Sequence, residues 1–444
     1  MPNRNVDHRT PPRRGFLSSP RDRRPIKSAD GGSMNDPQLY TQVIELEGHI
    51  IDSMILPQIM DEIMDRGGDF DIQEIRVGRR KSEPSYARLE IRATSPELLD
   101  RLVQHARRIG ATVPAMEQVR TEPAPADGVF PEGFYSTTNL ETLVRLDGGW
   151  VRVANPEMDL GIVVDWEART ARNCAIADVK MGEQVVVGHQ GIRVIPLERS
   201  REQKEVFGFM GSSVSSEKPK ASLIRQIASE MREIRDRGGK TLVVAGPAIS
   251  HTGSAPLMVK LIEAGYINYL FAGNALATHD IEAAFFGTSL GVSLAEGTPM
   301  EGGHQHHLRA INRIRRAGSI KAAVEQGILT KGIMYSCVKH GVEFVLAGSI
   351  RDDGPLPDVI TDVIEAQRRM RNIIQRGIDL TLMISTMLHS IAVGNLLPAT
   401  VTTVCVDINP AVVTKLADRG SFQAIGLVAD AEGFLRHLVA ELGL

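Results

Sequence analysis

The C-terminal half of the chain alternates short apolar runs with longer segments of helical, amphipathic periodicity. Apolar strands that alternate with helices are typical of a parallel sheet that is buried on both faces. The pattern therefore predicts an α/β fold with a parallel, doubly wound sheet over residues 220–444. The runs that we predict as its buried strands are Thr241–Ala245, Tyr269–Ala272, Glu343–Ala347, Leu380–Ile384, Thr402–Val406 and Ala424–Val428.

Residues 37–120 carry a different pattern, in which strands and helices are interleaved. Ala87–Ala93 alternates apolar and charged side chains, which predicts a half-buried strand. Apolar residues recur with helical spacing from Ile55 to Met64, and a second helix begins at Ser95-Pro96, an N-cap followed by proline in the first turn. The order β-α-β-β-α-β predicts a ferredoxin-like α+β module. Its other strands are expected near Thr41–Leu46, Phe70–Val77 and Ala111–Pro114.

Residues 121–219 form a β-rich segment and a linker. The stretch "GIVVDWEARTARNCAIADVKMGEQVVVGHQGIRVIPLE" consists of short β-branched runs between glycines and polar turns. This pattern predicts a small β-barrel or β-sandwich. The segment ends in the Gly/Ser-rich sequence "FGFMGSSVSSEKPK", which we interpret as a linker that also lines a cleft.

Composition narrows the class of protein. Of 444 residues, 42% are hydrophobic and 24% are charged, as in ordinary globular proteins, and the net charge of −3 offers no basic field for nucleic acid or a membrane. The most apolar stretch, Leu380 to Val406, is broken by His389, Asn395 and Pro398, so we expect no membrane span there. Cys174, Cys337 and Cys405 match no metal or redox spacing, which favours a reduced, cytoplasmic protein.

Residues 1–36 are the local exception. They are rich in arginine and proline and lack an apolar run, so we predict a disordered basic tail. The tail could lie upstream of a true start at Met34, and a targeting or nucleic-acid arm is the alternative interpretation.

Candidate chemistry collects where the predicted strands end. In an open parallel sheet, ligands bind beyond the carboxyl ends of the strands, where helix N-termini offer N–H groups to phosphate. Asp407 ends an apolar strand, as does the acidic residue that accepts the ribose hydroxyls of NAD. A carboxylate there would repel a 2′-phosphate, which favours NAD over NADP. An N-cap is the plainer interpretation of this aspartate.

Histidines and lysines supply a second group of candidates. His304, His306 and His307 occur in "EGGHQHHLRAIN" without the additional ligands that a zinc site needs, so we predict polar contacts or helix capping and no metal. Lys331 and Lys339 precede the Glu343 strand on a predicted helix, where a solvated lysine is the plainer interpretation.

Several of these stretches carry a family resemblance. "GPAISHTG", "FAGNALATHDIE", "SIRDDGPLPD" and "DINPAVVTKLADRGS" resemble the archaeal-type ornithine cyclodeaminases, which also form the C-terminal half of bifunctional arginine dihydrolase/ornithine cyclodeaminase proteins. "VIELEGHIIDSMILPQIMDEIMDRGGDFDIQEIRVG" resembles the LOR/SDH conserved region. The resemblance covers residues 40–444 and implies a LOR/SDH module, a β-rich module and an NAD-binding domain similar to that of deoxyhypusine synthase. Residues 1–36 are too short for an arginine dihydrolase domain, so we expect ornithine to come from elsewhere.

The resemblance implies conversion of L-ornithine to L-proline and ammonia, with NAD as a recycled hydride acceptor. Nucleophilic attack by the δ-amine requires a base; His251, Asp280 and Lys331 are candidates by position. We expect a homo-oligomer that binds this amino acid and neither nucleic acid nor membrane. The residues implied to contact NAD are Asn274, Ala275, Asp353, Ser385, Thr386, Met387, Leu388, Asp407, Ala429 and Asp430.

Two rival functions remain open from sequence. One is another NAD-dependent reaction of an amine or amino acid, such as aminoalkyl transfer or dehydrogenation, on the same scaffold. The other is a non-catalytic amino-acid or NAD sensor built on the ferredoxin-like module. Release of reduced cofactor would indicate a dehydrogenase, and ligand-induced stabilisation without turnover would indicate a sensor.

Overall fold

The computed structural model of the protein describes residues 39–51, 53–80, 83–113, 118–195, 220–352, 354–418 and 424–444. The predicted basic tail at residues 1–36, Met34 included, and residues 207–219 of the predicted linker lie outside these ranges. Within them, no helix is long and apolar enough to cross a membrane.

The first module has the predicted ferredoxin-like order. Its elements are β1 (Tyr40–Gly48), α1 (Ile55–Asp65), β2 (Asp69–Arg76), β3 (Ser85–Ala93) and α2 (Pro96–Arg108). The strands pair antiparallel in the order β1-β3-β2, and the apolar sides of α1 and α2 pack on the sheet around Ile59, Leu89 and Leu102. Ser95 caps α2 by accepting a hydrogen bond from the Leu98 N–H at 3.1 Å.

The fourth strand of this module is shorter than predicted. In the described part of Ala111–Pro114, Thr112 forms a single antiparallel bridge with Glu45, with both N–H···O distances at 2.7 Å. The bridge lies on the β1 side, where the fourth strand of a ferredoxin-like sheet belongs. Pro114 lies outside the described residues.

The second module is β-rich, as predicted. A seven-stranded sheet has the order β10-β5-β6-β8-β7-β9-β4. Val144, Ile162 and Val186, from different strands, share one buried core. The elements are β4 (Arg120–Pro123), β5 (Glu141–Leu146), β6 (Gly149–Ala154), β7 (Gly161–Asp165), β8 (Thr170–Cys174), η1 (Ile176–Asp178), β9 (Gln184–Val187) and β10 (Ile192–Ile195).

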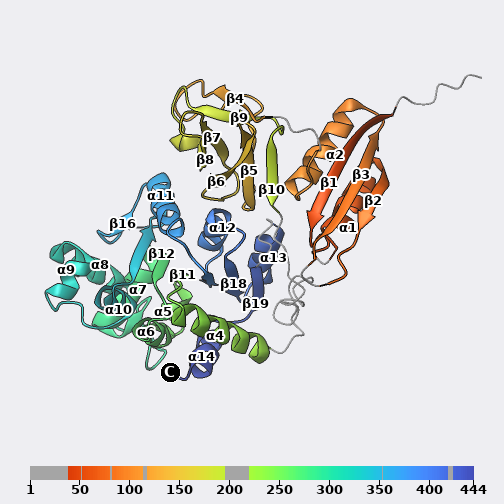
Figure 1. Ribbon diagram of the computed structural model, residues 1–444. Helices are drawn as coiled ribbons and strands as arrows, with labels where there is room; N and C mark the ends of the chain where they lie inside the picture. Colours follow the sequence, from red (N-terminus) through yellow and green to blue (C-terminus); the bar gives the residue numbers. More distant parts are fainter. Residues whose placement is uncertain are drawn as a thin grey trace, which may run out of the picture. The chain divides into compact units, whose positions relative to one another are not determined.

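The third module is built on a parallel sheet with the order β16-β15-β12-β11-β17-β18-β19 (Figure 1). All six strands predicted from the apolar runs are present. The seventh, β16, is a two-residue edge strand that the sequence pattern did not indicate. The strands are β11 (Thr241–Ala245), β12 (Tyr269–Gly273), β15 (Glu343–Ala347), β16 (Val359–Ile360), β17 (Leu380–Ile384), β18 (Thr402–Asp407) and β19 (Ala424–Val428).

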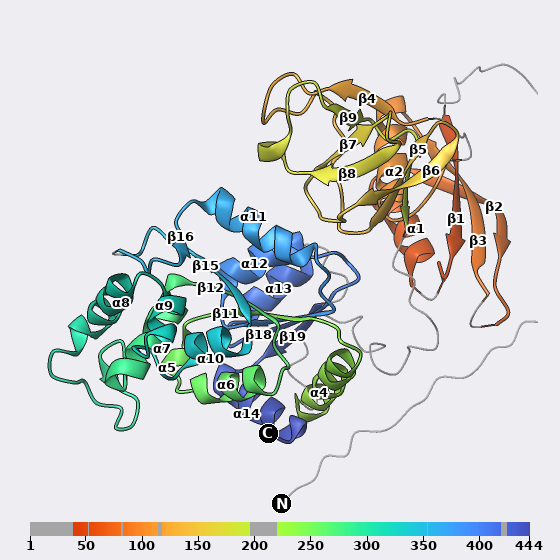
Figure 2. The ribbon, with the colours of Figure 1, turned by 60° about the vertical axis from the view of Figure 1, so that its left-hand side comes forward.

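Helices cover both faces of this sheet (Figure 2). Successive side chains of β11 point to opposite faces of the sheet, and both faces are apolar. Val243 packs in the core under one set of helices, and Val244 packs in the core under the other. The first set is α4 (Lys220–Asp236), α5 (Ala248–His251), α6 (Ala255–Glu263), α7 (Asn274–Phe286), α8 (His306–Ala317), α9 (Ile320–Glu325), α10 (Ile333–His340) and α14 (Ala431–Leu442). The second set is α11 (Val363–Ile374), α12 (Met387–Leu396) and α13 (Pro410–Asp418). The small elements β13 (Thr288–Ser289), β14 (Val292–Ser293) and η3 (Gly303–Gln305) lie between α7 and α8. The predicted doubly wound fold is confirmed.

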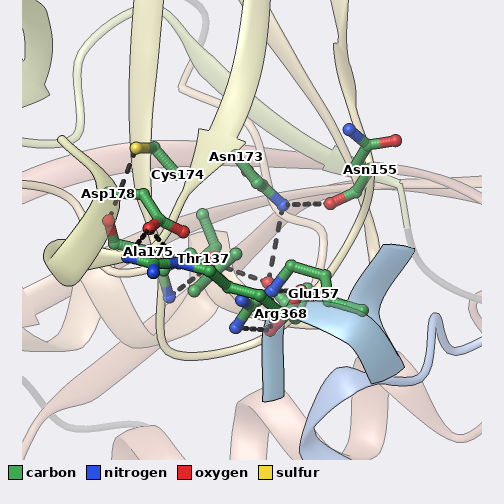
Figure 3. Close-up of polar contacts among 10 residues, drawn as sticks. Thr137, Asn155, Glu157, Asn173, Cys174, Ala175, Asp178 and Arg368 are labelled. Carbon is green, nitrogen blue, oxygen red and sulfur yellow. Dashed lines mark hydrogen bonds and ion pairs between the residues drawn. The ribbon is translucent and has the colours of Figure 1, made fainter. Parts of the chain in front are cut away.

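Ion pairs connect α11 to the β-rich module (Figure 3). Arg371 forms a bidentate pair with Glu157, with Nε 2.8 Å from Oε2 and Nη2 2.9 Å from Oε1. Only 11% and 5% of these two side chains are exposed, so this pair is largely removed from water. Arg368 donates to Asp178 one turn earlier on α11.

Candidate functional site

The carboxyl edge of the parallel sheet contains a topological switch point. From β11 the chain moves outward through β12, β15 and β16, and then returns to place β17 on the other side of β11. The Gly246 N–H donates to the Ile384 carbonyl at 2.8 Å, and a Cβ at Gly246 would lie 1.8 Å from the Ser385 carbonyl oxygen. Only glycine fits here. Ligands of open parallel sheets bind at such a point.

The helix that begins at the switch point offers backbone donors. Ser385 has a φ of 52°, an unusual left-handed conformation for a residue with a side chain, and Thr386 precedes α12 without forming a side-chain cap. The first N–H groups of a helix have no partner inside the helix. Met387 and Leu388 are 45% and 74% exposed, so this helix start lies at the surface. The four predicted residues Ser385–Leu388 thus form one accessible helix start.

Asp407 lies on the adjacent strand. The Ser385 N–H donates to the Val406 carbonyl at 2.9 Å, which fixes Asp407 one residue further along the same edge. Its Oδ1 accepts from the Asn409 N–H at 2.8 Å, and Oδ2 has no hydrogen-bond partner among the described residues. Asp407 as a whole is 9% exposed. One oxygen therefore stabilises the turn and the other remains able to accept from a ligand.

Ala429 and Asp430 come directly after the end of β19. The Ala429 N–H donates to the Asp407 carbonyl at 3.1 Å, so the two residues are neighbours. Asp430 caps α14 by accepting from the Gly433 N–H at 2.7 Å. The carboxylate of Asp430 therefore has a structural role at this edge.

Asn274 and Ala275 begin α7 on the other side of the switch point. Asn274 is 8% exposed. Its Oδ1 accepts from the Leu356 N–H at 3.1 Å, and its Nδ2 donates to Asp352 Oδ1 at 3.3 Å. These contacts tie α7 to the loop that follows β15. Asp353, the predicted contact in that loop, lies outside the described residues.

His389 approaches the same edge from α12 and was not among the predicted residues. A Cβ at Gly273 would lie 3.0 Å from its Cε1 atom, so the absence of a side chain at Gly273 leaves space for the imidazole. Burial lowers the pKa of His389. A neutral imidazole thus lies between the ends of β12 and β17.

The predicted catalytic residues occupy three different environments. Asp280 is 1% exposed, and its two oxygens accept from the Ile333 and Met334 N–H groups at 2.8 and 2.9 Å. It therefore caps α10 and presents no free oxygen to a substrate, although burial raises its pKa to about 6. Lys331 is exposed in the turn before α10. His251 is half-buried on α5, and its Nδ1 lies 2.7 Å from Ser289 Oγ.

Two further residues of α7, His279 and Glu282, contact the same region. Nδ1 of His279 lies 2.8 Å from Oε2 of Glu282, and the His279 and His251 ring centroids are 4.7 Å apart. The sequence "HDIE" places both on one helix face by its i, i+3 spacing, which is the signal that could have identified them. His306, by contrast, stacks on Phe286 and contacts Thr288, as the prediction of polar contacts anticipated. Among the described residues, no acidic, histidine or cysteine cluster could hold a metal ion.

Two cavities of the described residues lie away from the switch point. One lies at the amino ends of β11, β12 and β15, next to Lys240, Asn268 and Glu343. The other lies on the β-rich module next to Trp166 and Arg172. Neither is lined by a strand-end residue from the carboxyl edge, and the candidate site at the switch point rests on the positions of the strand ends.

A doubly wound parallel sheet with small and acidic groups at its switch point defines a Rossmann-type α/β protein. Comparison with known families agrees. Residues 225–438 match the Rossmann-fold C-terminal region of ArgZ-like arginine dihydrolases, and residues 141–224 match the first C-terminal region of the same proteins. Residues 41–140 match the LOR/SDH bifunctional enzyme conserved region. An ornithine cyclodeaminase of Methanothermobacter thermautotrophicus is 57% identical over 91% of this chain and 98% of that protein. The chain belongs to the ornithine cyclodeaminase family.

Solved structures show the same fold. The apo structure of ArgZ, an arginine dihydrolase from the ornithine-ammonia cycle in cyanobacteria, is 42% identical with a TM-score of 0.79. The ternary complex of AgrE with ornithine and NAD+ is also 42% identical, with a TM-score of 0.50. The matches cover 91% of this chain and 58% of ArgZ and of AgrE.

Proposed function

We propose that the protein is an NAD-dependent ornithine cyclodeaminase that converts L-ornithine to L-proline and ammonia. The observation that carries the proposal is the alignment of Asp407, Ser385 and Asn274 along one edge of the sheet, across its switch point. The family membership and the AgrE complex with ornithine and NAD+ support the same conclusion. A cytoplasmic location and a homo-oligomer stay predictions.

The residues present fit a dinucleotide. The free Oδ2 of Asp407 would accept from ribose hydroxyls, and the uncapped N–H groups at the start of α12 would bind the pyrophosphate. Asn274 and Ala275 would then contact the nicotinamide half, because they lie on the opposite side of the switch point from Asp407. Bound NAD supplies a hydride acceptor for the α-carbon and returns the hydride at the end of the reaction.

The chain itself must orient the amino acid and move its protons. Oxidation and ring closure both need a neutral amine, whereas amines of this type are protonated near pH 7. Of the three residues predicted from position as the base, His251 and Lys331 are not bound by the N-terminus of α10. Asp280 is left out because the N-terminus of α10 occupies both of its oxygens.

The reaction class can be tested with ornithine that carries deuterium at the α-carbon. Purified protein with NAD should form proline and ammonia in equal amounts, and the proline should keep much of its deuterium at the α-carbon. Absorbance of reduced NAD should stay flat. Steady accumulation of reduced NAD would instead indicate a dehydrogenase. Binding of NAD or ornithine without any proline would indicate a sensor, and either result would refute the proposal.

A further inference from the structure

Glu282 is a buried carboxylate whose bonds keep it ionised. The residue is fully buried on α7, and within the described chain it forms no ion pair with lysine or arginine. Its Oε1 accepts from Thr288 Oγ1 and from the Gly291 N–H, both at 2.9 Å, and its Oε2 lies 2.8 Å from Nδ1 of His279. Burial acts to raise the pKa of Glu282, but the hydrogen bonds from His279, Gly291 and Thr288 outweigh burial and hold it below the usual value.

An ionised carboxylate fixes the tautomer of the histidine beside it. A carboxylate can only accept hydrogen bonds, so Nδ1 of His279 carries the hydrogen. In the neutral ring, Nε2 is then an acceptor, and it has no hydrogen-bond partner among the residues described. The same carboxylate stabilises the imidazolium that forms when Nε2 takes up a proton. The pair is therefore arranged as a general base with its orienting group.

The pair lies close to the residues proposed to hold the nicotinamide half of NAD. His279 is five residues after Asn274 on the same helix, about 7.5 Å along its axis. His251, which follows the switch-point glycine on α5, lies against the His279 ring. The titratable groups that face this ring are Glu282 on α7, His251 on α5 and His307 on α8, whose ring centroid is 6.3 Å away. Arg313 of α8 lies over the Phe285 and Phe286 rings.

We propose that His279 is the general base that carries protons between the two amines of the substrate, and that Glu282 is its positioning residue. This inference rests on the proposed cyclodeaminase function. The lone pair of the neutral δ-nitrogen forms the new C–N bond to the α-carbon imine, and the C=N electron pair moves to the α-nitrogen. An N–H bond of the δ-nitrogen then breaks, its electron pair stays on that nitrogen, and Nε2 of His279 receives the proton. The proton then passes to the departing nitrogen. Two such transfers release ammonia, NH3, and leave the ring nitrogen in a neutral C=N bond, so protons balance.

The test compares His279→Gln and Glu282→Gln with His304→Gln, an exposed histidine of η3 that serves as the control. We expect kcat to fall by about 10²–10⁴-fold in both test variants, with Kd for NAD within a few-fold of wild type. A purely structural role would lower the Tm of these variants or raise their Kd for NAD together with the loss of kcat, which would overturn the inference.

A second readout does not depend on turnover. In protein labelled with ¹⁵N-histidine, the resonances absent from His279→Gln identify the ring, and we expect hydrogen on Nδ1 at neutral pH. In Glu282→Gln, the amide oxygen should keep the hydrogen bonds from Thr288 and Gly291, so the NH2 group faces Nδ1 of His279. An NH2 group donates, so the hydrogen of the ring should shift from Nδ1 to Nε2. Hydrogen on Nε2 in the wild type would overturn the inference, even if proline forms. Absence of proline from wild type together with the expected tautomer would refute the proposed function alone.

Discussion

Replacing Asp407 with asparagine tests the proposed ribose contact directly. Asparagine keeps an oxygen that can accept from the Asn409 N–H, so the turn after β18 should persist. The change removes the negative charge and replaces one acceptor oxygen with a donor amide. Because Asp407 lies at the carboxyl end of β18 beside the switch point, its charge is expected to contribute more to binding than to folding.

The size of the effect follows from the number of free acceptors. Oδ1 is already used within the turn, so Oδ2 is the oxygen available to a ribose hydroxyl. A hydrogen bond to a charged group contributes about 1.5–3 kcal/mol. At about 1.4 kcal/mol per factor of ten, loss of one such bond predicts that Kd for NAD rises by about 10–150-fold.

The assay is a calorimetric or fluorescence titration of NAD, with Tm measured in parallel. Asp379→Asn is the matched control, because Asp379 contacts Arg237 and the Lys240 N–H at the opposite, amino edge of the sheet. Its Kd for NAD should match that of wild type. If folded Asp407→Asn binds NAD as tightly as wild type, the ribose assignment is wrong.

Two other predictions concern stability. Arg371→Met should lower the free energy of unfolding by about 3–5 kcal/mol in chemical unfolding, because Glu157 would be left as an unpaired buried charge. Adding Glu157→Gln to Arg371→Met should recover part of this loss. No recovery in the double variant would contradict the ion-pair argument. For Asp280, the folded-state pKa of about 6 lies above the ordinary 3.8, so the folded protein holds this proton more tightly than the unfolded chain. Stability relative to Asp280→Asn should therefore be highest below about pH 4, decrease by about 3 kcal/mol up to about pH 6 and stay constant above it. A difference that does not vary with pH in urea unfolding would contradict this.

The strands of the parallel sheet were predictable because both of their faces are buried. The strand Leu380–Ile384 is apolar except for Thr381, and helices of clear periodicity flank it. The amphipathic helices of the ferredoxin-like module and the Ser95 cap were equally visible. The two-residue strand β16 and the bridge at Thr112 were not, because their pairing comes from neighbouring strands and leaves little periodicity in so short a segment.

The candidate site was predictable only in part. Strand-end positions follow from the strands themselves, so Asn274, Ser385 and Asp407 could be selected before any contact was known. Asp280 shows that position in the sequence alone does not identify a catalytic residue. A carboxylate in an apolar helix looks like a catalytic group, but the chain returns from far along the sequence to place the N-terminus of α10 against both oxygens.

The sequence by itself determined the succession of α+β, β-rich and α/β modules, the strand ends that offer ligand contacts, and the pairing of His279 and Glu282 on one helix face. Those features depend on local periodicity and on spacings of a few residues. Tertiary structure alone decided which strands meet at the switch point, that Gly246 must lack a side chain, and that the Thr288–Gly291 turn folds back to bind Glu282. The reason is physical: a buried charge or a close backbone approach is stabilised by groups distant in sequence, and no local pattern records which groups those are.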